Sequence, residues 1–227
     1  MSDPTADAPV KTLGLSAALH GYLVEHGTPP DAILRELTAE TRERVGPMSM
    51  MQIAPEQGAF LTLMTRLIGA RRAIEIGTFT GYSALCIARG LPADGKLLCC
   101  DVNEEWTSIG RRYWERAGVA DRIDLRIAPA LETLDALPAD RSWDLAFVDA
   151  HKPEYLDYLE RLVGLIRPGG LILVDNVLWN GQVLDERDRS AETVAIRAFN
   201  EAVAKDDRFD RAMVSISDGL TLLRPIR

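Results

Sequence analysis

The chain has 227 residues, 47% of them hydrophobic, and carries a formal net charge of −8 at pH 7. This size fits one α/β domain better than two, and we expect residues 12–227 to form it behind a flexible N-terminus at residues 1–11. The negative charge disfavours tight binding to a nucleic-acid backbone. No apolar run approaches the ~18 residues of a membrane span, and the first residues lack the pattern of a signal peptide. With three cysteines that form no C-x-x-C pair, the sequence predicts a soluble cytoplasmic protein that binds neither nucleic acid nor membrane.

The N-terminal part of the domain is expected to be helical over residues 12–50. Apolar residues recur near helical spacing from Thr12 to Val45, with an interruption at residues 27–30 that predicts two helices. A third helix is predicted from Pro55 to Gly69, because proline suits a first helical turn and glycine closes the helix.

From there on, short apolar runs alternate with helical stretches. The apolar runs are residues 73–76, 96–101, 123–127, 145–149 and 171–175. The helical stretches lie near residues 81–90, 104–117, 131–137, 153–166 and 191–205. This alternation predicts a doubly wound, Rossmann-like α/β fold whose strands are mostly parallel and buried on both faces. Residues 212–217 and 220–224 are joined by a turn so short that they must form an antiparallel pair at the end of the sheet.

Two predicted strands end in residues with hard oxygen ligands. Asp149 follows one strand, and Asp175 and Asn176 follow the next. Carboxylate and amide oxygens suit a small divalent cation such as Mg²⁺, which leaves other coordination positions to water or substrate. The sequence therefore predicts a metal enzyme.

A glycine turn follows the strand at residues 73–76. Gly77 and Gly81 allow the backbone to approach a ligand, and Asp101, at the end of the next strand, can accept hydrogen bonds from ribose hydroxyls. The turn lacks the G-x-G-x-x-G fingerprint, which favours a nucleotide-like cofactor without pyrophosphate. A plain structural turn, and an acid that ends a strand for solvation, are the alternatives.

Glu75 lies inside an apolar strand, where an unpaired carboxylate is costly. Either an internal lysine, arginine or helix N-terminus answers its charge, or a ligand ammonium group or ordered water does. We favour the ligand.

At these residues the chain resembles the cation-dependent class I O-methyltransferases that use S-adenosylmethionine, the caffeoyl-CoA and catechol type. The resemblance extends from Met48 to Arg224 and rests on five motifs in the right order: residues 48–58, 75–83, 149–152, 175–181 and 217–221. It implies a seven-stranded sheet whose last strand is antiparallel, and a homodimer formed largely by the N-terminal helices.

The resemblance also implies a set of ligand-binding residues. S-adenosylmethionine would contact Met51, Ile53, Glu75, Gly77, Tyr82, Ser83, Asp101, Ala130, Asp149 and Tyr158. Within that set Asp101 would hold the ribose, Ala130 would contact adenine through its backbone, and Glu75, Ser83 and Asp149 would surround the methionine portion. A divalent cation, Mg²⁺ ahead of Mn²⁺ or Ca²⁺, would be held by Asp149, Asp175 and Asn176.

Methyl transfer to a phenol requires the phenol to lose its proton, although its pKa is near that of tyrosine, ~10. A metal that binds two adjacent oxygens would stabilise the phenolate, so the expected acceptor is a small catechol-like aromatic molecule. Lys152 is predicted to be the general base; an electrostatic or structural lysine is the alternative. Trp179 and Tyr155 are predicted to line the aromatic acceptor slot.

Other residues near these motifs have less specific interpretations. His151 stands where most look-alikes have an acidic residue, and we interpret it as a packing or solvent residue rather than a ligand or base. The remaining tryptophans, Trp106, Trp114 and Trp143, are predicted to serve packing. Residues 183–193 form either a lid or a solvated connection.

Three rival functions remain. An NAD-dependent oxidoreductase would share the glycine turn but leaves the acidic strand ends and the reversed hairpin unexplained. A tRNA hydroxyuridine O-methyltransferase on the same scaffold would need a basic face, for which the candidates are Arg42, Arg44, Arg71 and Arg72. A catalytically idle binding protein is disfavoured because the metal ligands and the lysine are all present.

Overall fold

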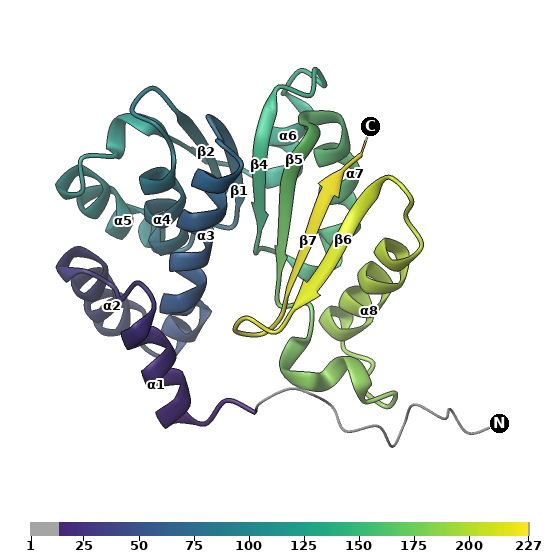
Figure 1. The fold of residues 1–227 in the computed structure, drawn as a ribbon, viewed down its shortest axis with the longest axis horizontal. Coiled ribbons are helices and arrows are strands. Elements are labelled where there is room, and N and C mark those ends of the chain that lie inside the picture. Colours follow the sequence, from purple (N-terminus) through teal and green to yellow (C-terminus); the bar gives the residue numbers. More distant parts are fainter. Residues whose placement is uncertain (1–13, 227) are drawn as a thin grey trace.

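The computed structural model describes residues 14–226, so the flexible N-terminus predicted for residues 1–11 lies outside the described residues. One seven-stranded sheet runs through the molecule in the order β3-β2-β1-β4-β5-β7-β6 (Figure 1). Its strands are β1 (Arg72–Ile76), β2 (Lys96–Asp101), β3 (Ile123–Ile127), β4 (Trp143–Val148), β5 (Ile166–Asp175), β6 (Phe209–Val214) and β7 (Leu220–Pro225). The first five strands pair in parallel, and β7 is antiparallel to both of its neighbours. The prediction of a mostly parallel sheet with a reversed last strand is confirmed.

Two strands differ clearly from the predicted bounds. Strand β5 begins at Ile166 and not at residue 171, and β6 is displaced toward the N-terminus. Residues 212–217 were expected to be a strand, but β6 begins at Phe209 and ends at Val214. Ser217 and Gly219 have positive φ angles of 49° and 86°, so the chain turns here instead of continuing the ladder. The carbonyls of Asp218 and Gly219 accept hydrogen bonds from the segment after β5, at 3.0 and 3.2 Å. The β6–β7 turn therefore supports the edge of the sheet at which β5 ends.

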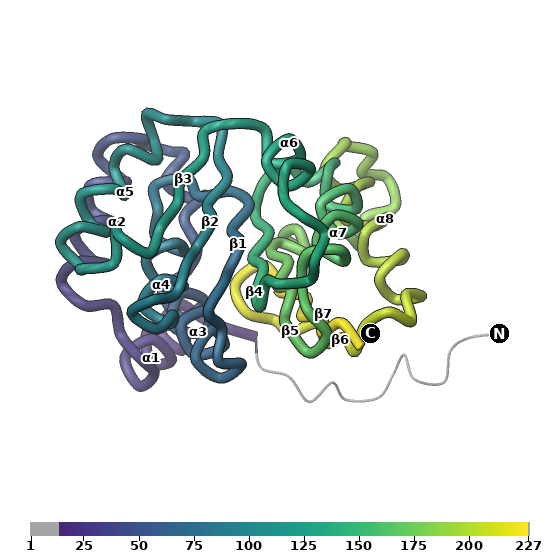
Figure 2. Tube along the Cα trace, turned by 90° about the horizontal axis from the view of Figure 1, so that it is seen from above, coloured from purple at the N-terminus to yellow at the C-terminus, as the bar shows by residue number. Residues whose placement is uncertain are grey.

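Helices cover both faces of the sheet (Figure 2). One face carries α2 (Ala32–Val45), α3 (Pro55–Leu67), α4 (Tyr82–Gly90) and α5 (Glu104–Arg116). The other face carries α6 (Ala130–Asp135), α7 (Tyr155–Leu165) and α8 (Ala191–Ala204). Side chains alternate between the two faces along each strand. Ile74 and Ile76 therefore belong to the hydrophobic core under α6, α7 and α8, whereas Ala73 belongs to the core under α2 to α5. Glu75 projects to the same side as Ala73.

The two helices predicted before the Pro55 helix are present as α1 (Ala17–His26) and α2, and the short helix η1 (Gly46–Met51) follows them. Helix α1 has no buried residue. Helix α2 is fixed more firmly, because the Thr41 hydroxyl donates to Thr80 Oγ1 at 2.9 Å in the core and Tyr113 donates to Glu40 at 2.7 Å. Helix α2 therefore supports the turn after β1 through the bond between Thr41 and Thr80.

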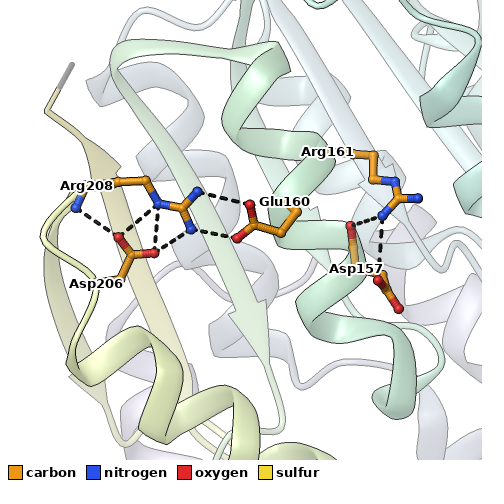
Figure 3. A network of polar contacts seen from close by, with 5 residues as sticks. All are labelled: Asp157, Glu160, Arg161, Asp206 and Arg208. Carbon is orange, nitrogen blue, oxygen red and sulfur yellow. Dashed lines mark hydrogen bonds and ion pairs between the residues drawn. The ribbon is translucent and has the colours of Figure 1, made fainter.

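A polar network on the surface ties α7 to the start of β6 (Figure 3). Arg208 donates to both carboxylate oxygens of Glu160, at 3.0 and 2.6 Å, and also to Asp206. Arg161 and Asp157 form a second pair on α7, with 3.6 Å between Nη1 and Oδ1. Exposed pairs of this kind contribute ~1 kcal/mol or less each, so they orient the edge strand more than they stabilise it.

The structure also describes the surroundings of the cysteines and the lengths of the helices. Cys86, Cys99 and Cys100 are all buried and unpaired. Among residues 14–226, each helix is too short or too polar to cross a membrane.

Candidate active site

A cavity of about 900 Å³ lies at the carboxyl ends of the parallel strands, the lower edge of the sheet in Figure 1. The structure brings thirteen of the predicted site residues to its wall: Met51, Ile53, Gly77, Tyr82, Ser83, Asp101, Ala130, Asp149, Lys152, Tyr158, Asp175, Asn176 and Trp179. These residues come from seven segments of chain. Parallel strands deliver their ends to one edge, which is why residues so far apart in the sequence meet.

The conformation of the turn after β1 is fixed by backbone contacts. Gly77 has φ of +91°, and a Cβ atom at this position would lie 2.1 Å from the carbonyl oxygen of Asp149. Asp101 Oδ2 accepts hydrogen bonds from the backbone N–H groups of Thr78 and Phe79, at 2.9 and 2.8 Å. Asp101 therefore shapes the turn in addition to lining the cavity. Glycine at residue 77 therefore allows the turn to pack directly on the backbone that follows β4, where a side chain would not fit.

Glu75 lies behind this turn and is fully buried, so it does not reach the cavity wall. Neither carboxylate oxygen has a hydrogen-bond partner in the described part of the chain. Burial raises the pKa of Glu75 to about 7, and the nearby Ser83 and Thr78 oppose that rise without forming normal hydrogen bonds. No lysine or arginine of residues 14–226 pairs with it, so the first turn of α4, which holds Ser83, is the nearest group that could answer its charge.

Two carboxylates and one lysine meet at the ends of β4 and β5. The ammonium group of Lys152 donates to Asp149 Oδ1 at 2.8 Å. Asp175 is 2% exposed, and burial together with the charge of Asp149 raises its pKa to about 7. Asn176 follows with φ of 58°, and its backbone N–H donates to Asp175 Oδ1 at 2.8 Å. The described residues contain no group of three or more His, Cys, Asp or Glu able to hold a metal, so a metal here would rely on two carboxylates and an amide.

Aromatic rings surround the lysine. Lys152 Nζ lies 5.8 Å from the ring centroid of Trp179, which lines the cavity, and 5.1 Å from that of Tyr155. The expectation that Tyr155 lines the acceptor slot is wrong. Its side chain is 1% exposed, packs edge-on against Phe199, and donates from its hydroxyl to the carbonyl of Asp175 at 3.1 Å. Tyr155 therefore supports the backbone of Asp175 at the end of β5.

Gln57, Phe79 and Trp106 are among the cavity residues that the sequence interpretation missed. Gln57 is fully buried and lines the cavity, and neither atom of its amide has a hydrogen-bond partner among the described residues. Trp106 packs edge-on against Phe79, with 5.2 Å between ring centroids, and both rings also line the cavity. The expectation that Trp106 serves packing alone is therefore wrong. Gln57 belongs to the motif at residues 48–58, which was the available signal.

The other two tryptophans do serve packing. Trp114 is buried and donates from Nε1 to the carbonyl of Gly81 at 3.0 Å. Trp143 is buried beneath the guanidinium of Arg72, which lies 4.2 Å from its ring centroid. His151 is exposed at the mouth of the cavity and caps nothing with its side chain.

The segment over residues 183–193 is held in place by Arg197. This side chain on α8 donates to the carbonyls of Val183 at 2.9 Å and Asp188 at 2.9 Å, to that of Asp185, and to that of Gln182 just before the segment. Asp188 in turn accepts from the backbone of Ser190 and from Thr193, at 2.8 Å each. These contacts favour the fixed connection over the lid.

A smaller cavity of about 410 Å³ adjoins the first and shares Asn180, Ser217 and Asp218 with it. Its other wall is the start of α1, where His20 Nε2 lies 2.9 Å from a carboxylate oxygen of Glu56. The N–H of Asn180 donates to Asp218 Oδ1 at 2.6 Å. The β6–β7 turn thus separates the two spaces.

The fold and this edge define a doubly wound α/β protein with a cofactor-type turn beside an acidic site. The chain belongs to the O-methyltransferase family, whose sequence model matches residues 24–226. It is 40% identical to Caffeoyl-CoA O-methyltransferase 2 of Zea mays, over 96% of this chain and 86% of that protein. It is also 40% identical to Caffeoyl-CoA O-methyltransferase of Eucalyptus gunnii, over 96% of this chain and 91% of that protein.

Solved structures agree with this assignment. The O-methyltransferase TomG from Streptomyces achromogenes, in complex with SAM, superposes with a TM-score of 0.84 at 30% identity and covers 92% of this chain and 96% of its own. The O-methyltransferase from Bacillus cereus, in complex with SAH, gives 0.82 at 30% identity, covering 91% and 97%.

Proposed function

We propose that the protein transfers a methyl group from S-adenosylmethionine to a phenolic hydroxyl of a catechol-like small molecule, with a divalent cation and with Lys152 as general base. The observation that carries this proposal is the meeting of Lys152, Asp149 and Asp175 in one cavity with the turn after β1. Relatives named caffeoyl-CoA O-methyltransferases, and family structures in complex with SAM or SAH, support the reaction type.

The residues present fit S-adenosylmethionine. Gly77 lines the cavity in a turn that packs directly on the backbone of Asp149, and the buried Glu75 beneath it lacks a cationic partner among the described residues. A ligand with an ammonium group above the turn would lower the electrostatic cost of that carboxylate. Phe79 and Trp106 offer ring faces on which an adenine could pack.

The acidic edge also fits a divalent cation. Asp149, Asp175 and Asn176 would hold it, because the mutual repulsion that raises the pKa of Asp175 would be relieved by a positive ion between the carboxylates. When bound, the cation supplies positive charge that stabilises a phenolate, and S-adenosylmethionine supplies the methyl group.

This chain's own residues have distinct roles in the reaction. Lys152 Nζ would take the proton of the acceptor hydroxyl as a neutral amine, so the ammonium that donates to Asp149 Oδ1 would first release one proton to solvent and then turn to the substrate. Trp179 would orient the aromatic ring of the acceptor. The packed rings of Tyr155 and Phe199 would hold the end of β5, which carries Asp175, in place. Fixing acceptor and methyl donor in line can supply several kcal/mol of the barrier, on the order of 7–11 in favourable cases.

The proposal is tested by methyl transfer from labelled S-adenosylmethionine to a panel of catechols and caffeoyl esters, with Mg²⁺ or with EDTA, for wild type and Asp175→Ala. We expect product that requires the metal and disappears in the variant. Equal product with EDTA would remove the metal from the mechanism. Failure to bind S-adenosylmethionine at all would overturn the proposal.

The tRNA alternative has less support. Arg71 and Arg72 lie at the start of β1, the opposite end of the strand from the cavity, where Arg71 pairs with Asp94 and Arg72 stacks on Trp143. A salt-sensitive gel shift with tRNA, run beside the catechol assay, would restore that alternative.

We also propose that the protein acts as a homodimer in the cytoplasm. Apolar side chains are exposed on α1, among them Tyr22 at 59%, and on the following helix α3, among them Leu63 at 57% and Leu67 at 72%. Buried unpaired thiols agree with a reducing compartment.

A further inference from the structure

The walls of the main cavity are strongly acidic. Six carboxylates line it: Asp101, Asp149, Glu154, Asp175, Glu192 and Asp218. The only lysine on the wall is Lys152, which is bonded to Asp149, and no arginine of residues 14–226 lines either cavity. Even with Asp149 and Asp175 assigned to a metal and Asp101 to the turn, the acceptor side keeps a negative charge.

Glu192 is the cavity-lining carboxylate that has neither an ion-pair partner nor a side-chain hydrogen bond within residues 14–226. It stands in the first turn of α8 and is half-buried, so only the helix N-terminus favours its charge. Asp218 and Glu154 differ because their carboxylates accept hydrogen bonds from the N–H of Asn180 and the hydroxyl of Tyr158. Glu56, in the smaller cavity, is paired with His20. Glu192 is therefore the carboxylate most available to a cationic ligand.

The neighbouring segment does not reverse this charge. Residues 183–191 carry three acids and two arginines. Arg187 is paired with Asp185, and the guanidinium of Arg197 on α8 donates to four backbone carbonyls. Arg189 forms no ion pair within residues 14–226, but the four acids and two arginines of residues 185–192 still leave a net charge of −2. A ligand that enters past Glu192 therefore meets a negative rim.

A second observation favours a polar ligand in this cavity. Gln57 is fully buried on its wall beside Asp175, where its amide opposes the rise in the pKa of that carboxyl. Neither atom of the amide makes a hydrogen bond of normal geometry among the described residues, so a polar ligand beside Gln57 would supply a partner that the chain does not.

Resting on the function proposed above, we propose that the acceptor is a catechol with a cationic side chain, and that Glu192 selects it over a coenzyme A thioester. Coenzyme A carries several phosphate charges, which a negative rim repels, whereas an ammonium group is attracted to it. The relatives named for caffeoyl-CoA would then differ from this chain in the charge of the acceptor molecule that they methylate.

The test compares kcat/KM for dopamine and for caffeoyl-CoA, each divided by kcat/KM for the neutral 4-methylcatechol. In wild type we expect the dopamine ratio to exceed one and the caffeoyl-CoA ratio to fall below it. Glu192→Gln should lower the dopamine ratio by roughly threefold, the size of a half-exposed ion pair. Glu192→Lys should raise the caffeoyl-CoA ratio by roughly tenfold, and added salt should weaken every difference.

Glu201→Lys is the matched control, because it makes the same charge change on the same helix at an exposed position away from both cavities. Its ratios should equal those of wild type. A wild-type preference for caffeoyl-CoA over dopamine, or unchanged ratios in both Glu192 variants, would overturn the inference. If 4-methylcatechol itself is not methylated, the proposed function fails and this inference falls with it; if it is methylated and only the ratios disagree, the proposed function stands.

Discussion

Glu75 is a carboxylate inside the sheet with no cation beside it in the described part of the chain, and this makes folding of the ligand-free protein sensitive to pH. Its pKa is raised from 4.5 to about 7 by burial. The folded state therefore binds the proton more tightly than the unfolded state, and stability that is present below pH 4.5 is lost as the pH rises through 7. Such a shift corresponds to about 3 kcal/mol.

We expect Glu75→Gln to be more stable than wild type at pH 8, by up to about 3 kcal/mol, and to lose most of that advantage at pH 5. Urea unfolding of both proteins without cofactor, at the two pH values, measures the difference. The exposed Glu105→Gln is the control and should show no such pH dependence. The variant should also gain less stability from S-adenosylmethionine. An advantage that is equal at both pH values would contradict this account of Glu75.

Lys152 presents a second question at the residue scale, because a base and a fixed positive charge predict different variants. If Lys152 accepts the proton, both Lys152→Met and Lys152→Arg should lower kcat by about 10²–10⁴, since guanidinium stays protonated. If its charge alone matters, Lys152→Arg should retain most activity. Single-turnover rates at saturating metal decide between them, and calorimetric titration with S-adenosylmethionine should show that cofactor affinity is retained in both variants.

At the scale of elements, the turn after β1 depends on the close approach of two strands. Gly77→Ala would force a Cβ atom against the carbonyl of Asp149, in addition to the strain of a positive φ angle. Gly118 also has a positive φ angle, but a Cβ atom there would meet nothing within 4 Å. We expect Gly118→Ala to cost about 1 kcal/mol and Gly77→Ala at least about 3. Equal losses of unfolding free energy in the two variants would show that the clash relaxes freely.

The segment over residues 183–193 is expected to owe its order to one side chain. Arg197→Ala removes hydrogen bonds to three carbonyls of this segment and to that of Gln182 just before it. We expect faster hydrogen exchange and proteolysis confined to the segment, and a higher KM for the acceptor with a smaller change in kcat. Arg197→Lys is the matched control, because one ammonium retains the charge but cannot reach all four carbonyls. A protected segment in Arg197→Ala would assign its order to Asp188 instead.

At the scale of the whole molecule, the sequence predicts the sheet better than it predicts the wall of the cavity. Strands β1, β2, β4 and β5 are mostly buried, so unbroken apolar runs identify them. Strand β3 is an edge strand with no fully buried residue, so the expectation of burial on both faces is wrong there, and its alternation of apolar and polar residues identifies it instead. Strand β6 is an edge strand with mostly exposed residues, and its start at Phe209 has no such signal. Motifs predict that Asp149 and Asp175 share an edge, because parallel strands end together.

Side-chain direction is harder to predict, since it depends on packing between elements. Tyr155 and Trp106 both lie at helix starts next to site motifs, yet the first turns inward beneath Asp175 while the second reaches the cavity. Gln57 reads as an ordinary polar residue of a helix until the tertiary structure buries it. Periodicity gives the face of an element, and neighbouring elements decide what that face meets.

Assembly is the last property to test, because the N-terminal helices expose apolar surface that a monomer would leave in water. Leu63 and Leu67 lie one turn apart on α3 at 57% and 72% exposure, so they form one stripe. We expect sedimentation velocity to give a dimer at micromolar concentration and Leu67→Glu to shift it toward monomer, because a buried unpaired carboxylate opposes association. Leu184→Glu is the control, since Leu184 is 85% exposed but lies outside the N-terminal helices. Wild type that sediments only as monomer would remove the homodimer, and a monomer produced equally by both variants would place the interface elsewhere.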